Sequence, residues 1–197
     1  PETGEVASVY DGDTVTLESG DKIRLRWVNT PELKPAEAYG LEAKKLAEEL
    51  VLGQEITLIT NEDPRDGYGR IVAGVRTSDK DLSVELLEQG LAHLFIIPPD
   101  DTDLSAMVAA QGRAQAAKLG IWSTDRYQGA LHITSFHANA RGDDNENVNG
   151  EYARICNVSA VDVNLKGYVV TDDDDHRFVL PDLVIPVGHT FQLHSGL

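Results

Sequence analysis

The stretch of residues 11–32 limits most strongly what this chain can fold into. It reads DGDTVTLESGDKIRLRWVNTPE and contains two strand-like runs, 14–17 and 23–28, separated by the turn residues Ser19-Gly20-Asp21. This pattern predicts two antiparallel strands joined by a tight turn. Pro31 cannot continue a central strand, so the chain has to leave the sheet there.

The predicted hairpin brings four oxygen-bearing side chains to one end. Asp11 and Asp13 stand where the first run begins, and Asn29 and Glu32 stand where the second run ends. Calcium binds several oxygen ligands, and an anion held on that cation needs fixed positive charge, which Arg24 can supply bidentately. The alternative is a plain hairpin with an acidic turn, because Asp-Gly and Thr-Pro-Glu are also ordinary turn sequences.

A second arginine favours the ligand-binding interpretation. Residues 66–70, Asp66-Gly67-Tyr68-Gly69-Arg70, form a glycine-rich turn before a strand-like run over residues 71–75. Glycines allow close approach to a ligand, Tyr68 offers a stacking face, and Arg70 offers a second phosphate-binding fork. Asp66 and Tyr68 join Arg24 and Arg70 as candidate substrate-binding residues.

Six motifs follow one another along the chain: DGDT, RLRWVNTPE, YGLEA, DGYGRIVAGV, LLEQGLA and LGIWS. Their order resembles that of the staphylococcal nuclease (thermonuclease) family, and the resemblance covers about residues 5–123. It implies a mainly β fold, a five-stranded OB-type barrel with three helices, in a domain of residues 1–125. It also implies a calcium-dependent nuclease that acts on DNA or RNA, including single strands.

The resemblance assigns metal-binding roles by motif position. Asp13 is the implied direct calcium ligand, the Thr30 backbone carbonyl is another, and Asp11 is an outer carboxylate. The family's second aspartate ligand corresponds to Asn29, which keeps an oxygen but lacks a charge. We therefore expect weaker calcium binding.

Catalytic roles follow from the same resemblance. Glu32 is the implied general base that orients a water molecule, while Arg24 and Arg70 bind the phosphate and stabilise the extra negative charge of the transition state. The two tyrosines that cover the nucleotide in the family correspond to Ile96 and Pro98, so we expect no base stacking there.

Charge argues against a basic nucleic-acid-binding face. The formal net charge is −16 and the sequence pI is near 4.6, whereas proteins that grip nucleic acid by a broad surface are basic. A local positive site made by Arg24, Arg26, Arg70 and a cation would answer this objection. The alternative function is an inactive or weakened OB-fold nucleic-acid-binding module with a β-sandwich interaction domain.

Helical patterns are predicted over residues 36–52, 82–89 and 102–118, with Thr102 as the cap of the third helix. Residues 126–130 are the predicted linker. The acidic or amide-rich segments 145–150 and 172–175 are interpreted as loop and turn sequences and not as cation sites.

Residues 131–197 contain short alternating runs, which predict a small immunoglobulin-like β-sandwich segment. The segments GEY at 150–152, ICN at 155–157, VNLKGY at 163–168 and IPVG at 185–188 resemble the lamin-tail domain. This resemblance implies an incomplete domain with open strand edges for a protein partner or self-association.

No run is long and apolar enough to span a membrane, no signal peptide is present in this numbering, and we expect secretion.

Overall fold

The computed structural model describes residues 2–62, 64–137, 151–171 and 176–194. The segments 145–150 and 172–175, which we interpreted as loop and turn sequences, lie outside these ranges. The chain divides into two compact units, Pro1–Gln128 and Gly129–Leu197, and each is described by itself. No helix in the described ranges is long and apolar enough to cross a membrane.

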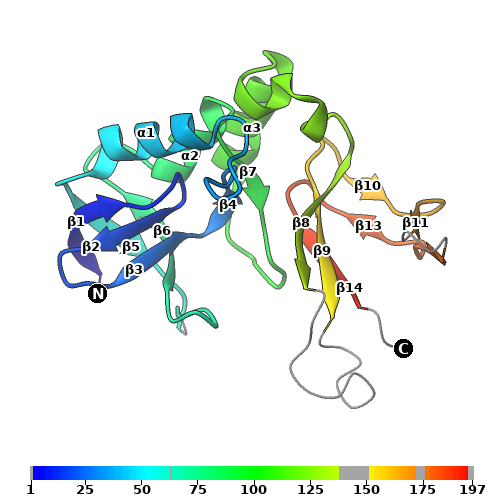
Figure 1. Ribbon diagram of the computed structural model, residues 1–197, viewed down its shortest axis with the longest axis horizontal. Helices are drawn as coiled ribbons and strands as arrows, with labels where there is room; N and C mark the ends of the chain where they lie inside the picture. The colour runs from blue at the N-terminus through cyan, green and yellow to red at the C-terminus, as the bar shows by residue number, and fades with distance from the viewer. Residues whose placement is uncertain (1, 63, 138–150, 172–175, 195–197) are drawn as a thin grey trace. The chain divides into compact units, whose positions relative to one another are not determined.

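The first unit is a closed barrel of five strands with helices packed against it (Figure 1). The strand order is β1-β2-β3-β6-β5, in which β3 and β6 run parallel and the other pairs run antiparallel. This is the predicted OB-type topology, so the predicted fold class is confirmed. The strands are β1 (Thr3–Val9), β2 (Thr14–Leu17), β3 (Lys22–Leu25), β5 (Glu55–Ile59) and β6 (Ile71–Arg76).

Alternating apolar residues explain why these strands close around a core. Val15, Leu17, Ile23 and Leu25 are at most 2% exposed, whereas the residues between them face outward or are half-buried. The helices α1 (Gly40–Val51), α2 (Leu82–Glu88) and α3 (Ser105–Ala116) are followed by the 3-10 turns η1 (Gly120–Ser123) and η2 (Asp125–Tyr127).

Two helices begin later than the sequence predicted. The α1 helix begins at Gly40 because Tyr39 has a left-handed backbone with φ of 71°. The α3 helix begins at Ser105, whose N–H donates to the Asp103 carboxylate at 3.0 Å, so the prediction that Thr102 caps this helix is wrong.

The second strand-like run of the sequence is broken in the structure. The strand β3 ends at Leu25, and Trp27 takes a left-handed φ of 71° at the start of β4 (Trp27–Asn29), which pairs with β7 (His93–Phe95) in a separate sheet. A continuous strand over residues 23–28 was therefore a wrong prediction. The break matters for the site because it redirects the chain just before Asn29 and Thr30.

The second unit is built from small β-sheets. Its three-stranded sheet has the order β14-β9-β8, and β10 pairs with β13 while β11 pairs with β12. Val163, Leu165, Leu180 and Ile185 form its core, and Cys156 is fully buried. The strands are β8 (Leu131–His137), β9 (Tyr152–Asn157), β10 (Val163–Asn164), β11 (Val169–Thr171), β12 (Arg177–Val179), β13 (Val184–Ile185) and β14 (Thr190–His194).

Candidate active site

The paired carboxylates Asp11 and Asp13 lie in the connection between β1 and β2, and both are buried. Gly12 separates them because no side chain fits there: a Cβ atom would lie 2.7 Å from the Ala43 Cβ and 2.7 Å from the Thr30 Cγ2. Our sequence reasoning assigned no role to this glycine, although its place between two aspartates was a visible signal. It lets α1 and Thr30 approach the acidic pair.

Hydrogen bonds fix the orientation of the Asp13 carboxylate. Its Oδ2 accepts from the Thr30 N–H at 2.8 Å and from the Thr30 hydroxyl at 3.0 Å, and its Oδ1 accepts from the Thr14 hydroxyl at 3.2 Å. The Asp11 Oδ1 in turn accepts from the Asp13 N–H at 3.1 Å. The predicted approach of residues 29–32 to the acidic pair is thus observed at Thr30.

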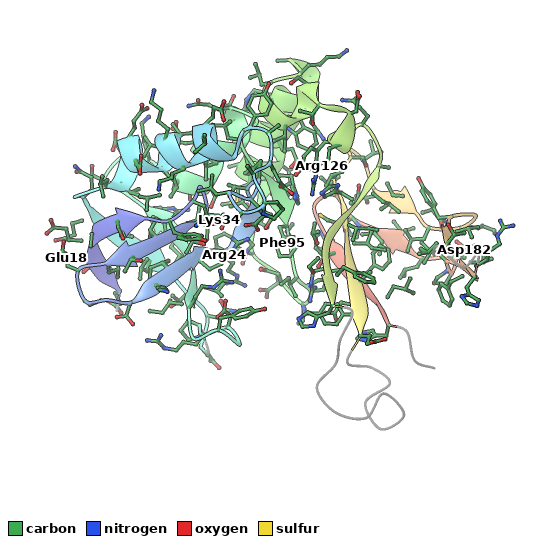
Figure 2. All side chains as sticks on the ribbon, viewed as in Figure 1. Glu18, Arg24, Lys34, Phe95, Arg126 and Asp182 are labelled. Atoms are coloured by element: carbon green, nitrogen blue, oxygen red, sulfur yellow. The ribbon has the colours of Figure 1, made fainter. Side chains whose placement is uncertain are left out.

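Arg24, labelled in Figure 2, forms hydrogen bonds across the interruption between the strands β3 and β4. Its Nη1 donates to the carbonyls of Leu25 and Val28, its Nη2 donates to the Asn29 Oδ1 at 2.9 Å, and its Nε lies 3.2 Å from the Asp13 Oδ1. Among the described residues, one N–H of Nη2 has no acceptor. A bidentate phosphate contact by Arg24 stays a prediction, and it would require Arg24 to give up one of these hydrogen bonds.

Arg70 has more donors to offer. Its Nε donates to the Asp66 Oδ2 at 2.8 Å, and no acceptor for its Nη1 or Nη2 is found among the described residues. The Asp66 Oδ1 accepts from the N–H groups of Tyr68 and Arg70, which closes the loop. Tyr68 is 81% exposed, and the Arg70 guanidinium carbon lies 5.4 Å from its ring centroid.

Asp66 contacts Arg70 and the loop that carries it. Burial alone would raise the pKa of Asp66, but the hydrogen bonds from Arg70 and Tyr68 outweigh burial and lower the pKa below the ordinary value of 3.8. Asp66 is thus an ionised partner of Arg70. Its predicted contact with substrate stays a prediction, while its contacts in the structure orient Arg70.

Glu32 is influenced by two acidic and two basic groups. Partial desolvation, followed by the charges of Asp13 and Glu37, raises the pKa of Glu32 above 4.5, while Arg24 and Arg70 lower it in part. No hydrogen bond to its carboxylate is found among the described residues. Contacts also bring these segments together, because Asp13 accepts from the N–H of Thr30, two residues before Glu32, and lies 3.2 Å from Arg24.

Two features of the sequence interpretation need correction or qualification. Arg26 does not join the site, because its Nη2 lies 2.7 Å from the Asp100 Oδ2 and its guanidinium covers the Trp27 ring. Ile96 is 2% exposed, so it packs in the core, while Pro98 is exposed. Positive charge at the site therefore comes from Arg24 and Arg70.

The donor set suits a hard cation. Asp11, Asp13 and Asn29 offer side-chain oxygens and Thr30 offers its carbonyl, which is the ligand chemistry of calcium. No three Asp, Glu, His or Cys side chains within the described ranges are grouped closely enough to hold a metal by themselves. A cation here would thus combine the Asp13 carboxylate with neutral oxygens and water, with the Asp11 carboxylate farther out, and we expect low affinity from that low charge count.

We expect Asp11→Asn to stabilise the calcium-free protein at neutral pH. Burial, followed by the charge of Asp13, raises the pKa of Asp11 from 3.8 to about 6. The stability that goes with this raised pKa is present below pH 3.8 and is lost as the pH rises through about 6. The amide avoids that loss, so the free energy of unfolding should increase by about 1–2 kcal/mol at pH 7 and little at pH 4. Urea unfolding in chelator measures both values, and an equal gain at the two pH values would contradict the prediction.

Barrel and site together define the class: an OB-fold protein with paired carboxylates next to two arginines. The chain belongs to the staphylococcal nuclease family, because the family model described as staphylococcal nuclease homologue matches residues 22–124. This confirms the resemblance predicted for the first unit. The match begins after Asp11 and Asp13, which are connected to the matched region through the Thr30 and Arg24 contacts.

Several relatives have related sequences. A thermonuclease of Staphylococcus intermedius is 33% identical over 124 residues, which cover 59% of this chain and 74% of that protein. A thermonuclease of Staphylococcus hyicus is 30% identical over 129 residues, covering 62% of this chain and 76% of that protein. Endonuclease YncB of Bacillus subtilis is 33% identical over 126 residues, covering 59% of this chain and 60% of that protein.

Proposed function

We propose that this chain is a calcium-dependent nuclease that hydrolyses phosphodiester bonds of DNA or RNA. The observation that carries the proposal is the contact of the Asp13 carboxylate with the Arg24 guanidinium at 3.2 Å and with the N–H of Thr30, two residues before Glu32, at 2.8 Å. Arg70 directly precedes β6, which pairs with the strand that carries Arg24. The relatives named thermonuclease and endonuclease support the same activity. A phosphodiester repels an attacking nucleophile, so a site that gathers cationic groups beside an orienting carboxylate suits its hydrolysis.

We assign the roles as follows. Asp13, the Thr30 carbonyl and Asn29 would hold calcium, with Asp11 as the outer carboxylate. When bound, calcium supplies positive charge that polarises the phosphoryl group. Arg70 binds the phosphate through its Nη1 and Nη2, and Arg24 contributes its charge and its remaining N–H.

The bond-making step uses Glu32. Its carboxylate takes a proton from a water molecule, whose oxygen forms a bond to phosphorus in line with the departing ester oxygen. The P–O bond to the departing ester oxygen breaks as the new one forms, and that oxygen takes a proton from solvent water to leave as a hydroxyl group. The two arginines stabilise the charge that develops on the phosphoryl oxygens. Asp66 keeps Arg70 in place, and the exposed Tyr68 ring is available to stack on a base.

An assay on single-stranded DNA tests the proposal directly. We expect hydrolysis in millimolar calcium and none in excess chelator, followed by recovery when calcium is restored. Binding of the DNA without hydrolysis in any of these conditions would contradict the nuclease and favour the alternative, a noncatalytic binding module.

Restoring a charge at Asn29 should tighten calcium binding. The Asn29 Oδ1 already accepts from Arg24, so Asn29→Asp keeps this hydrogen bond and adds a negative charge next to the donor set. We expect about a tenfold lower Kd for calcium, which corresponds to about 1.4 kcal/mol. Titration calorimetry measures the Kd of both forms, and an unchanged Kd would exclude Asn29 from the metal site.

The second unit completes the proposal as a lamin-tail-like domain, with residues 126–130 as the linker. Tyr127 lies in that linker segment but is buried against the first unit's His93 and Trp122. We also propose secretion, because the weak calcium binding expected from Asn29 would suit a calcium-rich extracellular setting.

We also propose that the second unit associates with a protein partner or with itself through β8. This strand is at the edge of its sheet, and its Phe136 is 73% exposed. Phe136→Glu should weaken such association, which sedimentation velocity of the full chain measures. A monomeric wild type would exclude self-association.

A further inference from the structure

We propose that Glu37 and Arg126 are positioning residues that fix Glu32 in its catalytic place. This inference rests on the proposed nuclease function, because it concerns the residue assigned there as general base. It starts from a chain of contacts that runs from the Glu32 backbone to the last turn of the first unit.

The first contacts close a small loop between Glu32 and Glu37. The Glu32 N–H donates to the Glu37 Oε2 at 3.0 Å, and the Glu37 N–H donates to the Glu32 carbonyl at 2.8 Å. Leu33 and Ala36 form an isolated antiparallel bridge inside the loop. Glu37 thus binds the Glu32 backbone from both its side chain and its main chain.

Arg126 holds the other oxygen of the same carboxylate. Its Nη2 lies 2.7 Å from the Glu37 Oε1, and the Glu37 side chain is only 17% exposed. Arg126, labelled in Figure 2, belongs to η2, and the next residue, Tyr127, is buried with its ring centroid 5.8 Å from that of Trp122. The guanidinium therefore extends from a well-packed backbone.

A second tie joins the same two segments. The Tyr39 hydroxyl and the Ser123 Oγ lie 3.0 Å apart. Tyr39 follows Glu37 by two residues, and Ser123 precedes Arg126 by three. The loop that carries Glu32 is thereby fastened at two points to the end of the first unit.

Backbone placement matters unusually for Glu32. Within the described ranges no group donates to its carboxylate, so the position of that carboxylate is set by the backbone that carries it. A misplacement of about 1 Å can cost about 10²-fold in rate. Without Arg126, the Glu37 carboxylate can turn to solvent and release the Glu32 N–H.

The competing explanation is that Arg126–Glu37 is an ordinary surface ion pair, which contributes little to anything. A comparison ion pair in the same unit separates the two explanations. Arg113 Nε donates to the Glu88 Oε1 at 2.7 Å and joins α3 to α2, and Arg113 is 59% exposed, close to the 53% of Arg126, although Glu88 at 43% is more exposed than Glu37. No hydrogen bond or ion pair found among the described residues joins the Arg113 pair to the site residues.

The experiment compares Arg126→Gln, Arg126→Lys and Arg113→Gln in the full chain. We expect Arg126→Gln to lower kcat about 10-fold with KM for single-stranded DNA within about twofold of wild type. Arg126→Lys keeps the charge and should restore most of the lost kcat. Arg113→Gln should leave kcat unchanged while lowering the Tm by a similar amount.

Amide hydrogen exchange gives a readout that is independent of catalysis. The Glu32 N–H should exchange faster in Arg126→Gln than in wild type, in calcium and in chelator, and it should be unaffected in Arg113→Gln. Unchanged kcat and exchange in Arg126→Gln, or an equal loss of kcat in Arg113→Gln, would overturn the inference alone. A wild type that cleaves nothing would overturn the proposed function, and this inference with it.

Discussion

Arg70→Ala should lower kcat/KM for single-stranded DNA about 10³-fold, since Arg70 is the arginine with donors to spare for the phosphate. Its Nε is bound to Asp66, while its Nη1 and Nη2 have no acceptor among the described residues. Removing the guanidinium takes away charge stabilisation in the transition state as well as binding. Initial rates over a range of DNA concentrations give kcat/KM for each form.

Two further variants serve as comparisons for Arg70→Ala. Arg76→Ala removes an arginine at the end of β6, the strand that begins directly after Arg70; Arg76 is paired with Asp81, and its removal should leave kcat/KM unchanged. Asp66→Asn keeps the Arg70 guanidinium but weakens the ion pair that orients it, so we expect a smaller loss of kcat/KM, about 10-fold. Activity of Arg70→Ala equal to wild type would exclude Arg70 from the mechanism.

Glu32→Gln should lower kcat about 10²–10⁴-fold while the affinity for single-stranded DNA stays the same or increases. The amide cannot accept the proton of the attacking water, but it has nearly the shape of the carboxylate. The fold should not change, because Glu32 is exposed and its carboxylate has no donor within the described ranges. Single-turnover cleavage and DNA binding in calcium measure the two quantities separately.

The control for Glu32→Gln is Glu49→Gln, which neutralises an exposed glutamate of α1 that pairs only with Lys45 in the described part of the chain. Its kcat should equal that of wild type. Undiminished cleavage by Glu32→Gln would mean that another group accepts the proton, and the mechanism proposed above would be wrong.

The two arginines show why a sequence predicts a site better than it predicts a mechanism. The family motifs predicted that Arg24 and Arg70 lie near one another, and the parallel pairing of β3 with β6 sets Arg24 opposite Val72, two residues after Arg70. Their remaining donors differ, however, because Arg24 binds the carbonyls that the break between β3 and β4 leaves open. That break depends on the left-handed Trp27, whose ring lies so close to Gly74 that a Cβ there would be 2.7 Å away.

The sequence by itself implied the barrel, its three helices and the candidate site residues through the order of the family motifs. Apolar alternation and turn residues, which are local properties of the chain, indicated the strands and approximate helix ranges. Only the tertiary structure decided which of the candidate side chains remain available to a ligand. Two ion pairs, Arg26 with Asp100 and Arg126 with Glu37, join segments that are distant in sequence. The hydrogen bonds of Arg24 to backbone carbonyls depend on the interruption between β3 and β4. Such contacts follow from packing, since each donor binds the acceptor that the fold brings within reach.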